Sequence, residues 1–382
     1  MRIHLLCEGN PETKDSWSGI TLSVLRELRR TGHVVDWTDV DLVGWSRLVA
    51  AASTFSINPR RWRSRYHLAA VPFLLRSGRA RAGLSRRPKP DVVLQIGATF
   101  RPSRSDVPVV FYCDSNILLA QHGRETGHGD AAPLSEREVA AIEDRERALY
   151  ESAAEIMTLS NRVAESFISD FGIPRERVHT VHGGPNLEIR LNDGPREPKR
   201  TVGPPTVLFV GRQFLRKGGD LLLRSFLKVR RAIPNARLLI VGPETLGDAE
   251  QVEQVELLGF LRPDDPTARA RLEQAYEDAD VFCLPTRFEA FGIVFLEAMH
   301  RGLPCIGPRA WAVPEMITDG VTGFLVPPED EDALAARLIE LLSDPSKARR
   351  MGEAGRRRAR EYFTWPATVE RINNVMEGVK RP

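Results

Sequence analysis

Two glutamates, Glu289 and Glu297, lie eight positions apart around an apolar run that only Gly292 interrupts. The run predicts a helix that begins near Phe291, with the first carboxylate in the loop before it and the second within its second turn. Carboxylates accept hydrogen bonds from hydroxyls, and the free amides at a helix N-terminus attract an anion. Two sugar rings joined by a diphosphate would present these groups in the same order.

A purely structural helix is the competing interpretation, in which Glu289 complements the helix dipole and Glu297 lies on the surface. We favour the binding interpretation because Glu297 is surrounded in the sequence by apolar residues. An ionised carboxylate in such a setting is costly to bury without a partner. The two glutamates are therefore candidates for binding hydroxyl groups of a ligand.

A glycine-rich basic loop is the second candidate. A predicted strand ends at Gly211, Arg212 and Lys217 follow in the loop, and Gly218 and Gly219 precede a predicted helix. Two cations and exposed amides beside a helix N-terminus form an anion site, to which glycine lets the backbone approach closely. A solvated turn with two surface cations is the alternative, since basic glycine loops are common.

The first strand-to-helix loop, residues 10–21, offers a third candidate. Ser18 and Gly19 lie where a helix N-terminus could meet a phosphate. The loop does not have the G-x-G-x-x-G pattern of a dinucleotide site. A helix capped by Ser16 or Ser18 explains the residues equally well, so both interpretations remain open.

No resident metal ion is expected. Asp278 and Asp280 resemble a carboxylate pair, but they directly precede a buried strand and are better explained as the end of a helix. Hard cations usually take more oxygen ligands than two carboxylates provide. The four cysteines are far apart, with neither metal-ligand spacing nor a disulfide framework, which suits a reducing cytoplasm.

The length of 382 residues favours two domains over one core. Short apolar runs alternate with amphipathic patterns in both halves, which predicts an α/β protein with two Rossmann-like, doubly wound parallel sheets. The two domains are expected to face a central cleft, because ligands bind at the carboxyl ends of such strands. The expected segments are a first domain at 1–192, a linker at 193–205, a second domain at 206–365 and a C-terminal helix at 366–382. This helix could pack on either domain, and one alternative is that it packs back on the first domain.

The charge and hydropathy of the chain indicate which kinds of partner it can bind. The net charge of +3 gives no argument for binding nucleic acid. No segment is long and apolar enough to act as a signal peptide or to span a bilayer, so a cytoplasmic protein is expected. A position at the inner face of a membrane remains an alternative because of the basic stretch described next.

Residues 42–90 contain ten Arg and one Lys but no Asp or Glu, and aromatic residues lie between them. The stretch is typical of a broken amphipathic helix, and we expect the interruption at Pro72. Such a surface could bind anionic lipid or an anionic acceptor. A solvated arginine-rich face is the third explanation.

Taken together, these stretches resemble glycosyltransferase family 4, a retaining group with the GT-B fold. The resemblance covers about residues 206–345, where VGRQFLRKGGD, LLIVGP, VELLGFL and ADVFCLPTRFEAFGIVFLEAMHRGLPCI are similar to the donor-binding domain and its Glu-x7-Glu motif. VPEMITDGVTGFLVPPEDEDALA is similar to the segment that follows. In the first half, TLSNRVAESFISDFGIPRERVHTVHGG resembles the end of the acceptor-binding domain.

The resemblance implies roles for the candidate residues. Arg212 and Lys217, beside Gly211, would hold the donor diphosphate and stabilise the leaving nucleotide in place of a metal ion. Glu289 would border the transferred sugar, and Glu297 would bind the ribose hydroxyls. Further expected contacts are Gly19 at the phosphate, Phe260 near the base, the amides of Phe291, Gly292 and Ile293 at the donor, and Asp114 on the acceptor side.

The function implied is that of a retaining, metal-independent glycosyltransferase that needs no cofactor. It would transfer a sugar from a UDP-, GDP- or ADP-sugar to an acceptor hydroxyl, in the biosynthesis of a cell-surface polysaccharide, glycolipid or glycoside. A GT-B sugar-nucleotide epimerase and a non-catalytic nucleotide-sugar-binding protein are the alternatives. A dinucleotide-dependent oxidoreductase is disfavoured because no glycine fingerprint follows the first strand.

Overall fold

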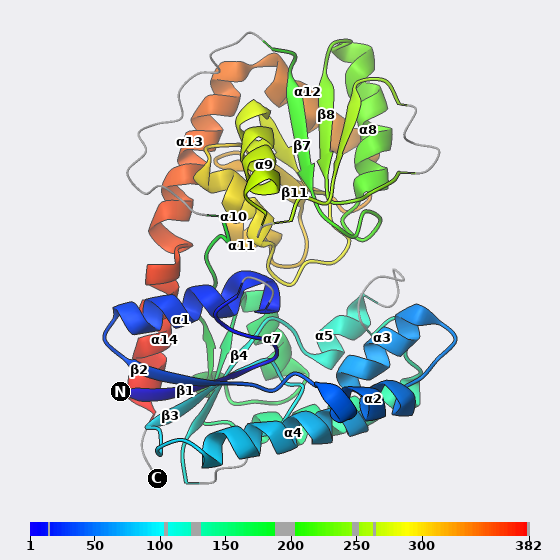
Figure 1. Ribbon diagram of the computed structural model, residues 1–382. Coiled ribbons are helices and arrows are strands. Elements are labelled where there is room, and N and C mark those ends of the chain that lie inside the picture. The colour runs from blue at the N-terminus through cyan, green and yellow to red at the C-terminus, as the bar shows by residue number, and fades with distance from the viewer. Residues whose placement is uncertain are drawn as a thin grey trace. The chain divides into compact units, whose positions relative to one another are not determined.

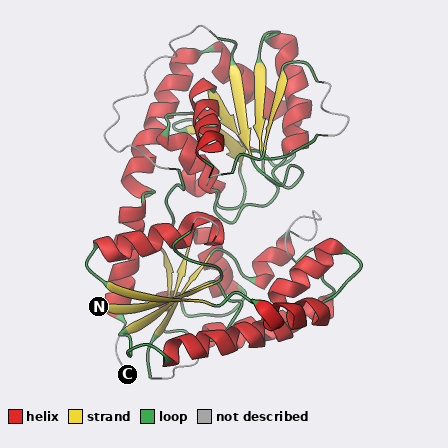
Figure 2. Ribbon diagram, in the orientation of Figure 1, coloured by secondary structure: helices red, strands yellow, loops and turns green. Residues whose placement is uncertain are grey.

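The computed structural model describes residues 1–13, 16–102, 106–123, 131–187, 203–246, 252–262 and 265–379. The chain forms two compact units, Met1–Gly183 with Trp365–Pro382, and Gly184–Thr364. The expected boundary at residue 192 and residues 193–202 of the expected linker lie outside the described residues. Each unit contains a parallel sheet with helices around it (Figure 2).

The first unit has a parallel sheet in which the described strands follow the order β2-β1-β3-β4-β5-β6. The sheet changes direction between β1 and β3, the place at which open sheets of this kind bind ligands. All residues of β3 are buried, as expected for a strand covered on both faces. The strands are β1 (Arg2–Cys7), β2 (Val34–Asp39), β3 (Val92–Ile96), β4 (Val109–Cys113), β5 (Glu155–Thr158) and β6 (Val178–Thr180).

The helices of the first unit begin at capping residues. Ser135 and Glu138 form a capping box at α6, and the Ser160 side chain accepts a hydrogen bond from the Val163 amide at α7. Figure 1 shows α1 and α4 on opposite sides of the sheet. The helices are η1 (Ser16–Gly19), α1 (Ile20–Arg30), α2 (Gly44–Ser53), α3 (Pro59–Leu68), α4 (Ala70–Ser85), α5 (Ile117–His122), α6 (Glu136–Glu151), α7 (Asn161–Ser169), η2 (Arg175–Arg177) and α14 (Trp365–Gly378).

The second unit has a parallel sheet with the order β12-β11-β10-β7-β8-β9. With β7 counted as its first strand, this is the doubly wound order 3-2-1-4-5-6. The direction therefore changes between β7 and β10, and the loops after these two strands meet at one edge. The strands are β7 (Thr206–Val210), β8 (Arg237–Val241), β9 (Val255–Gly259), β10 (Val281–Cys283), β11 (Cys305–Pro308) and β12 (Gly323–Val326).

The helices of the second unit bury apolar stripes against this sheet. In α8, residues such as Leu222, Phe226 and Val229 are fully buried, each contributing about 1.5–3 kcal/mol of transfer free energy. The sequence thus correctly predicts two doubly wound parallel sheets. The helices are α8 (Gly219–Ala232), α9 (Pro266–Asp278), α10 (Ile293–His300), α11 (Val313–Met316), α12 (Glu331–Ser343) and α13 (Pro345–Tyr362).

The basic stretch at 42–90 folds as α2, α3 and α4, and the expected interruption at Pro72 is wrong. The break lies at Ala69, whose backbone is extended between α3 and α4. Pro72 falls within the first turn of α4, where the ring is tolerated because that amide has no helical partner. Within the described chain, no helix has both the length and the apolar character required to cross a bilayer.

Candidate active site

The loop after β7 places a lysine at the edge of the second sheet. The amide of Lys217 donates to the Gln213 carbonyl (2.9 Å), and that of Gly218 donates to Leu215 (3.1 Å), so the loop turns back tightly toward the strand. A Cβ at Gly211 would lie 3.0 Å from Lys217 Cγ. Glycine at the strand end therefore leaves room for the stem of the lysine to cross it.

Lys217 forms an ion pair with Glu289, which joins the loops after β7 and β10 at the point where the sheet order reverses. Both side chains are largely withdrawn from water, with exposed fractions of 13% and 9%. Burial lowers the pKa of Lys217, and the neighbouring carboxylate opposes that change. The structure thus brings together two residues that the sequence had proposed separately.

The loop after β10 shapes the surroundings of Glu289. Gly292, with φ of 105°, is the N-cap of α10, which begins at Ile293, close to the expected start near Phe291. A Cβ at Gly292 would lie 2.9 Å from Phe295 Cδ2 and 3.1 Å from Glu289 Cγ. The glycine therefore provides both a left-handed backbone and the space that the carboxylate stem occupies.

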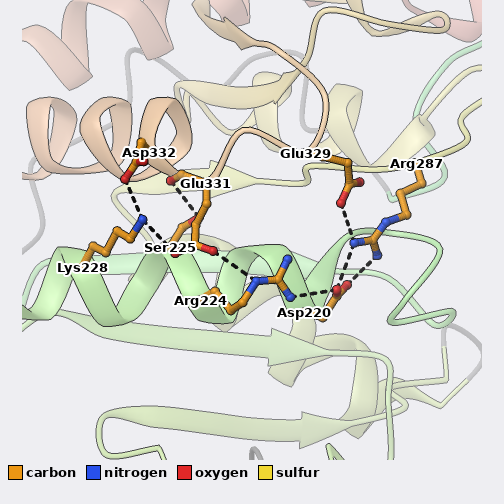
Figure 3. A network of polar contacts seen from close by, with 8 residues as sticks. All are labelled: Asp220, Arg224, Ser225, Lys228, Arg287, Glu329, Glu331 and Asp332. Atoms are coloured by element: carbon orange, nitrogen blue, oxygen red, sulfur yellow. Dashed lines mark hydrogen bonds and ion pairs between the residues drawn. The ribbon is translucent and has the colours of Figure 1, made fainter.

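Ion pairs hold this loop against α8 and against the turn that precedes α12. Arg287 binds both carboxylate oxygens of Asp220, at 2.5 and 2.9 Å, and also Glu329 at 2.8 Å (Figure 3). The Arg287 amide donates to the Arg216 carbonyl (2.9 Å), which ties the β10 loop directly to the β7 loop. Burial tends to raise the pKa of Asp220, but hydrogen bonds from Arg287 and Arg224 lower it. The bidentate contact fixes the loop geometry around Glu289.

Arg212 and Phe260 lie together at the ends of β7 and β9. The Arg212 guanidinium lies over the Phe260 ring, 4.8 Å from its centroid, and both residues are exposed. Close approach of the strand ends requires Gly242, where a Cβ would lie 2.5 Å from the Gly211 carbonyl oxygen. The expected phosphate and base contacts are thus adjacent on one exposed surface.

Glu297 is held inside the second unit. Its Oε2 accepts a hydrogen bond from the Tyr276 hydroxyl (3.0 Å), and the backbone amides of Asn186 and Leu187 also donate to it. The residue is 7% exposed, and burial raises the pKa of its carboxyl group to about 7. Its expected contact with ribose hydroxyls stays a prediction, and Tyr276 is a partner that the sequence did not indicate.

Glu297→Gln is expected to change the free energy of unfolding in a pH-dependent way. Because burial raises the folded-state pKa from 4.5 to about 7, the folded protein holds this proton more tightly than the unfolded chain. Wild-type stability therefore falls as pH rises through this interval, by up to about 3 kcal/mol, and the loss is complete above it. Denaturant titrations at about pH 5 and about pH 8 should show the variant gaining relative to wild type at the higher pH. The exposed Glu277→Gln is the control, and a pH-independent difference for Glu297→Gln would contradict the assignment.

Gly218→Ala is expected to disrupt the loop that carries Lys217. Gly218 has φ of 71°, and a Cβ there would lie 1.9 Å from the Pro285 carbonyl oxygen. Gly320 has φ of 73° with nothing within 4 Å, so Gly320→Ala measures the backbone strain alone, about 1–2 kcal/mol. Thermal unfolding should show a clearly larger loss for Gly218→Ala, and equal losses would contradict the steric argument.

Gly19 and Asp114 belong to the first unit. Trp17, Ser18 and Gly19 have φ of 45°, 56° and 85°, an unusual run of left-handed residues before α1. Trp17 Nε1 donates to Asp114 Oδ2 (3.1 Å), and its ring meets Tyr112 edge-on at 5.3 Å. This bond positions the Asp114 carboxylate at the end of β4. The sequence contains no signal for it, because the two residues are 97 positions apart.

A charged cluster that the sequence analysis missed lies after β1 and β3. Glu8 Oε2 is 2.9 Å from Nε of Arg76, whose side chain is wholly buried. Glu8 Oε1 accepts a hydrogen bond from the Thr99 hydroxyl. The only sequence signal was the place of Glu8 directly after the first strand. Because β1 and β3 flank the reversal of the first sheet, these groups lie where ligands bind in open sheets.

Asp278 and Asp280 have structural roles. Asp278 is the last residue of α9, as the helix-end interpretation predicts, and Asp280 Oδ2 accepts a hydrogen bond from the Thr206 amide (2.8 Å). Among the residues that the structure describes, no group of three or more His, Cys, Asp or Glu is placed to hold a metal ion.

Comparison with known proteins identifies the class. A solved structure of sucrose-phosphate synthase from Thermosynechococcus elongatus matches with a TM-score of 0.71 at 20% identity, over 98% of each chain. Two parallel Rossmann-like sheets with this match define the GT-B fold, which confirms the expected fold class.

Sequence comparison then identifies the family. The model for glycosyl transferases group 1 matches residues 194–358, and that for Glycosyltransferase Family 4 matches residues 20–189. A GDP-mannose-dependent alpha-(1-6)-phosphatidylinositol monomannoside mannosyltransferase from Mycolicibacterium smegmatis is 30% identical over 69% of this chain and 70% of its own length. A D-inositol 3-phosphate glycosyltransferase from Kribbella flavida is 30% identical over 59% of this chain and 56% of its own length. The chain belongs to the GT-B glycosyltransferases of the family 4 type.

Proposed function

We propose that the protein is a retaining glycosyltransferase that moves a sugar from a nucleotide-diphosphate sugar to an acceptor hydroxyl. The observation that supports this most directly is the Lys217–Glu289 ion pair at the reversal of the second sheet. It places a cation and a carboxylate side by side where open sheets bind nucleotides. The family supports the reaction class, and the geometry supports the site.

The proposed roles follow from charge. Lys217 and Arg212 offset the negative charge that develops on the diphosphate as the glycosidic bond breaks, so that no metal ion is required. Glu289 orients Lys217 and accepts hydrogen bonds from hydroxyls of the transferred sugar. Lys217 exchanges part of its contact with Glu289 for the diphosphate when the donor binds. Retention would follow if the incoming hydroxyl attacks on the face that the diphosphate leaves.

The donor is proposed to be a GDP-, UDP- or ADP-sugar, with a GDP-sugar tested first. The relative from M. smegmatis is named as GDP-mannose-dependent, which supports that order. Phe260 is proposed to stack on the base, since the residue is 38% exposed and lies beside Arg212. The product would belong to a cell-surface polysaccharide, glycolipid or glycoside. A cytoplasmic protein that is peripheral at the inner face of a membrane is part of the proposal.

The reaction can be tested with the three classes of donor. A donor that binds the folded protein should raise the melting temperature, and NMR of the product should show the donor's anomeric configuration preserved. Transfer should persist after treatment with a chelator. An inverted product would remove the retaining mechanism, and loss of activity with chelator would remove the metal-independent one. An epimerase would change the donor without transfer, and a binding protein would show a thermal shift without turnover.

A further inference from the structure

Exposed apolar side chains gather on α2 and on the connection to α3. Of the sixteen large apolar residues exposed on the described surface, nine fall within residues 43–74. Trp45, Leu48 and Val49 have the i, i+3, i+4 spacing that a globular helix usually turns toward its core. Ala50 is nevertheless the one buried residue of α2. An apolar stripe that faces outward in this way marks a binding surface.

These residues form a defined surface, which we call the α2 edge. Trp62 Nε1 donates to the Ala51 carbonyl (3.1 Å), and its ring meets Phe55 edge-on at 5.6 Å. Arg65 donates to the Phe55 carbonyl at 3.1 Å. These contacts hold α2 and its connection against α3. The α2 edge consists of Val43, Trp45, Leu48, Val49, Phe55 and Ile57, all at least half exposed.

The arginines beside the α2 edge are available to a partner. Arg47, Arg60 and Arg63 are exposed, and none makes an ion pair with a residue that the structure describes. Most basic residues elsewhere in the stretch are already neutralised: Arg61 and Arg65 by Glu138, Arg76 by Glu8, Arg87 by Asp36 and Lys89 by Asp106. Accessible positive charge therefore lies next to the apolar edge, in a segment without acids, and a further exposed arginine, Arg86, lies at the far end of α4.

An anionic bilayer matches this surface better than a second copy of the chain. A two-fold interface would place the same arginines opposite one another, and residues 42–90 contain no acid to neutralise them. A bilayer interface accepts tryptophan, phenylalanine and isoleucine in its apolar layer and binds arginine at its phosphates. Trp45 and Ile57, 83% and 92% exposed, are the side chains that protrude most.

We propose that the α2 edge inserts into the interface of an anionic bilayer, and that the acceptor hydroxyl belongs to a lipid of that bilayer. β2 ends at Asp39 and α2 begins at Gly44, so the docking segment leaves the sheet at its carboxyl edge. Glu8 and Thr99 lie at that same edge, where a ligand is expected. The lipid nature of the acceptor rests on the proposed transferase function, whereas the docking does not.

Docking is tested by sedimentation with phosphatidylcholine vesicles, with and without phosphatidylglycerol. Wild type should bind only the anionic vesicles, and added salt should weaken binding. Trp45→Ser/Ile57→Ser should bind at least about tenfold more weakly, and Arg60→Gln/Arg63→Gln about fivefold per arginine. Leu227→Ser on α8 and Arg86→Gln at the end of α4, both exposed, are matched controls and should bind like wild type. Equal binding to both kinds of vesicle, no binding, or loss of a dimer in the Trp45/Ile57 variant would overturn the proposal.

The acceptor class is tested with labelled donor and membranes. Labelled sugar should enter the organic-soluble fraction, and Trp45→Ser/Ile57→Ser should reduce this at least about tenfold while leaving the donor-induced thermal shift unchanged. Label that enters only water-soluble products would overturn the lipid acceptor. No transfer to any acceptor, together with intact vesicle binding, would instead remove the proposed function and leave the docking surface.

Discussion

Lys217→Ala is expected to lower kcat/KM by roughly a hundred- to a thousandfold, the loss seen when one fixed charge-stabilising group is removed. The lysine lies at the reversal of the second sheet, is largely withdrawn from water, and is held by Glu289. Because water screens charges less in such a setting, Lys217 attracts a diphosphate much more strongly than an exposed lysine would. Donor binding should weaken as well, which calorimetry with a nucleoside diphosphate would measure.

A second variant separates binding from stability. Lys217→Ala leaves the Glu289 carboxylate buried without its partner, a defect that typically costs 3–5 kcal/mol. Lys217→Ala/Glu289→Gln removes that charge, so it should recover much of the stability but none of the donor binding. Lys228→Ala removes a partly exposed ion-pairing lysine on α8; it is the control and should change neither stability nor donor binding by much. Recovery of donor binding in the double variant would show that Lys217 acts only on the fold.

Hydrophobic periodicity explains how much of the fold the sequence predicts. TVLFVG predicts a strand that the structure places at Thr206–Val210, and the amphipathic pattern after Gly219 predicts α8. Both predictions depend on local sequence alone, and the packing of the doubly wound sheet preserves the local structure that this sequence favours. The expected break at Pro72 failed because proline has different effects in a helix's first turn and in its interior. The sequence pattern alone does not distinguish these two positions.

The candidate site was predicted residue by residue but not as a set of contacts. Arg212, Lys217 and Glu289 have chemical types that suggest a role, so they can be recognised one at a time. The Lys217–Glu289 pair joins positions 72 apart, and only the strand order brings the two loops together. The same holds for Tyr276, which lies on α9 and donates its hydroxyl to Glu297 on α10. Long-range pairs of this kind depend on the order of the strands in the sheet. Hydrophobic periodicity along the sequence does not reveal that order.

Glu289→Gln is expected to separate transfer from binding. Transfer should fall by roughly a hundredfold or more, because the amide is a neutral and weaker acceptor for the sugar hydroxyls than the carboxylate. Binding of a nucleoside diphosphate should be retained or become several-fold tighter, because Lys217 no longer shares its charge with a carboxylate. Initial rates and calorimetry on the same preparations would measure the two effects. Parallel losses of transfer and binding would mean that Glu289 only supports the loop.

The pH dependence of diphosphate binding tests the Lys217–Glu289 ion pair in a second way. Burial lowers the pKa of Lys217, and Glu289 raises it. Removing the carboxylate therefore lowers that pKa further, so Lys217 loses its proton at a lower pH in Glu289→Gln than in wild type. Because the diphosphate binds the protonated lysine, its affinity should decline on the alkaline side, and this decline should begin at a lower pH in the variant. Calorimetric titrations across the alkaline range would show the two curves displaced in that direction. A displacement toward higher pH would mean that the carboxylate does not act on Lys217 as the ion pair requires.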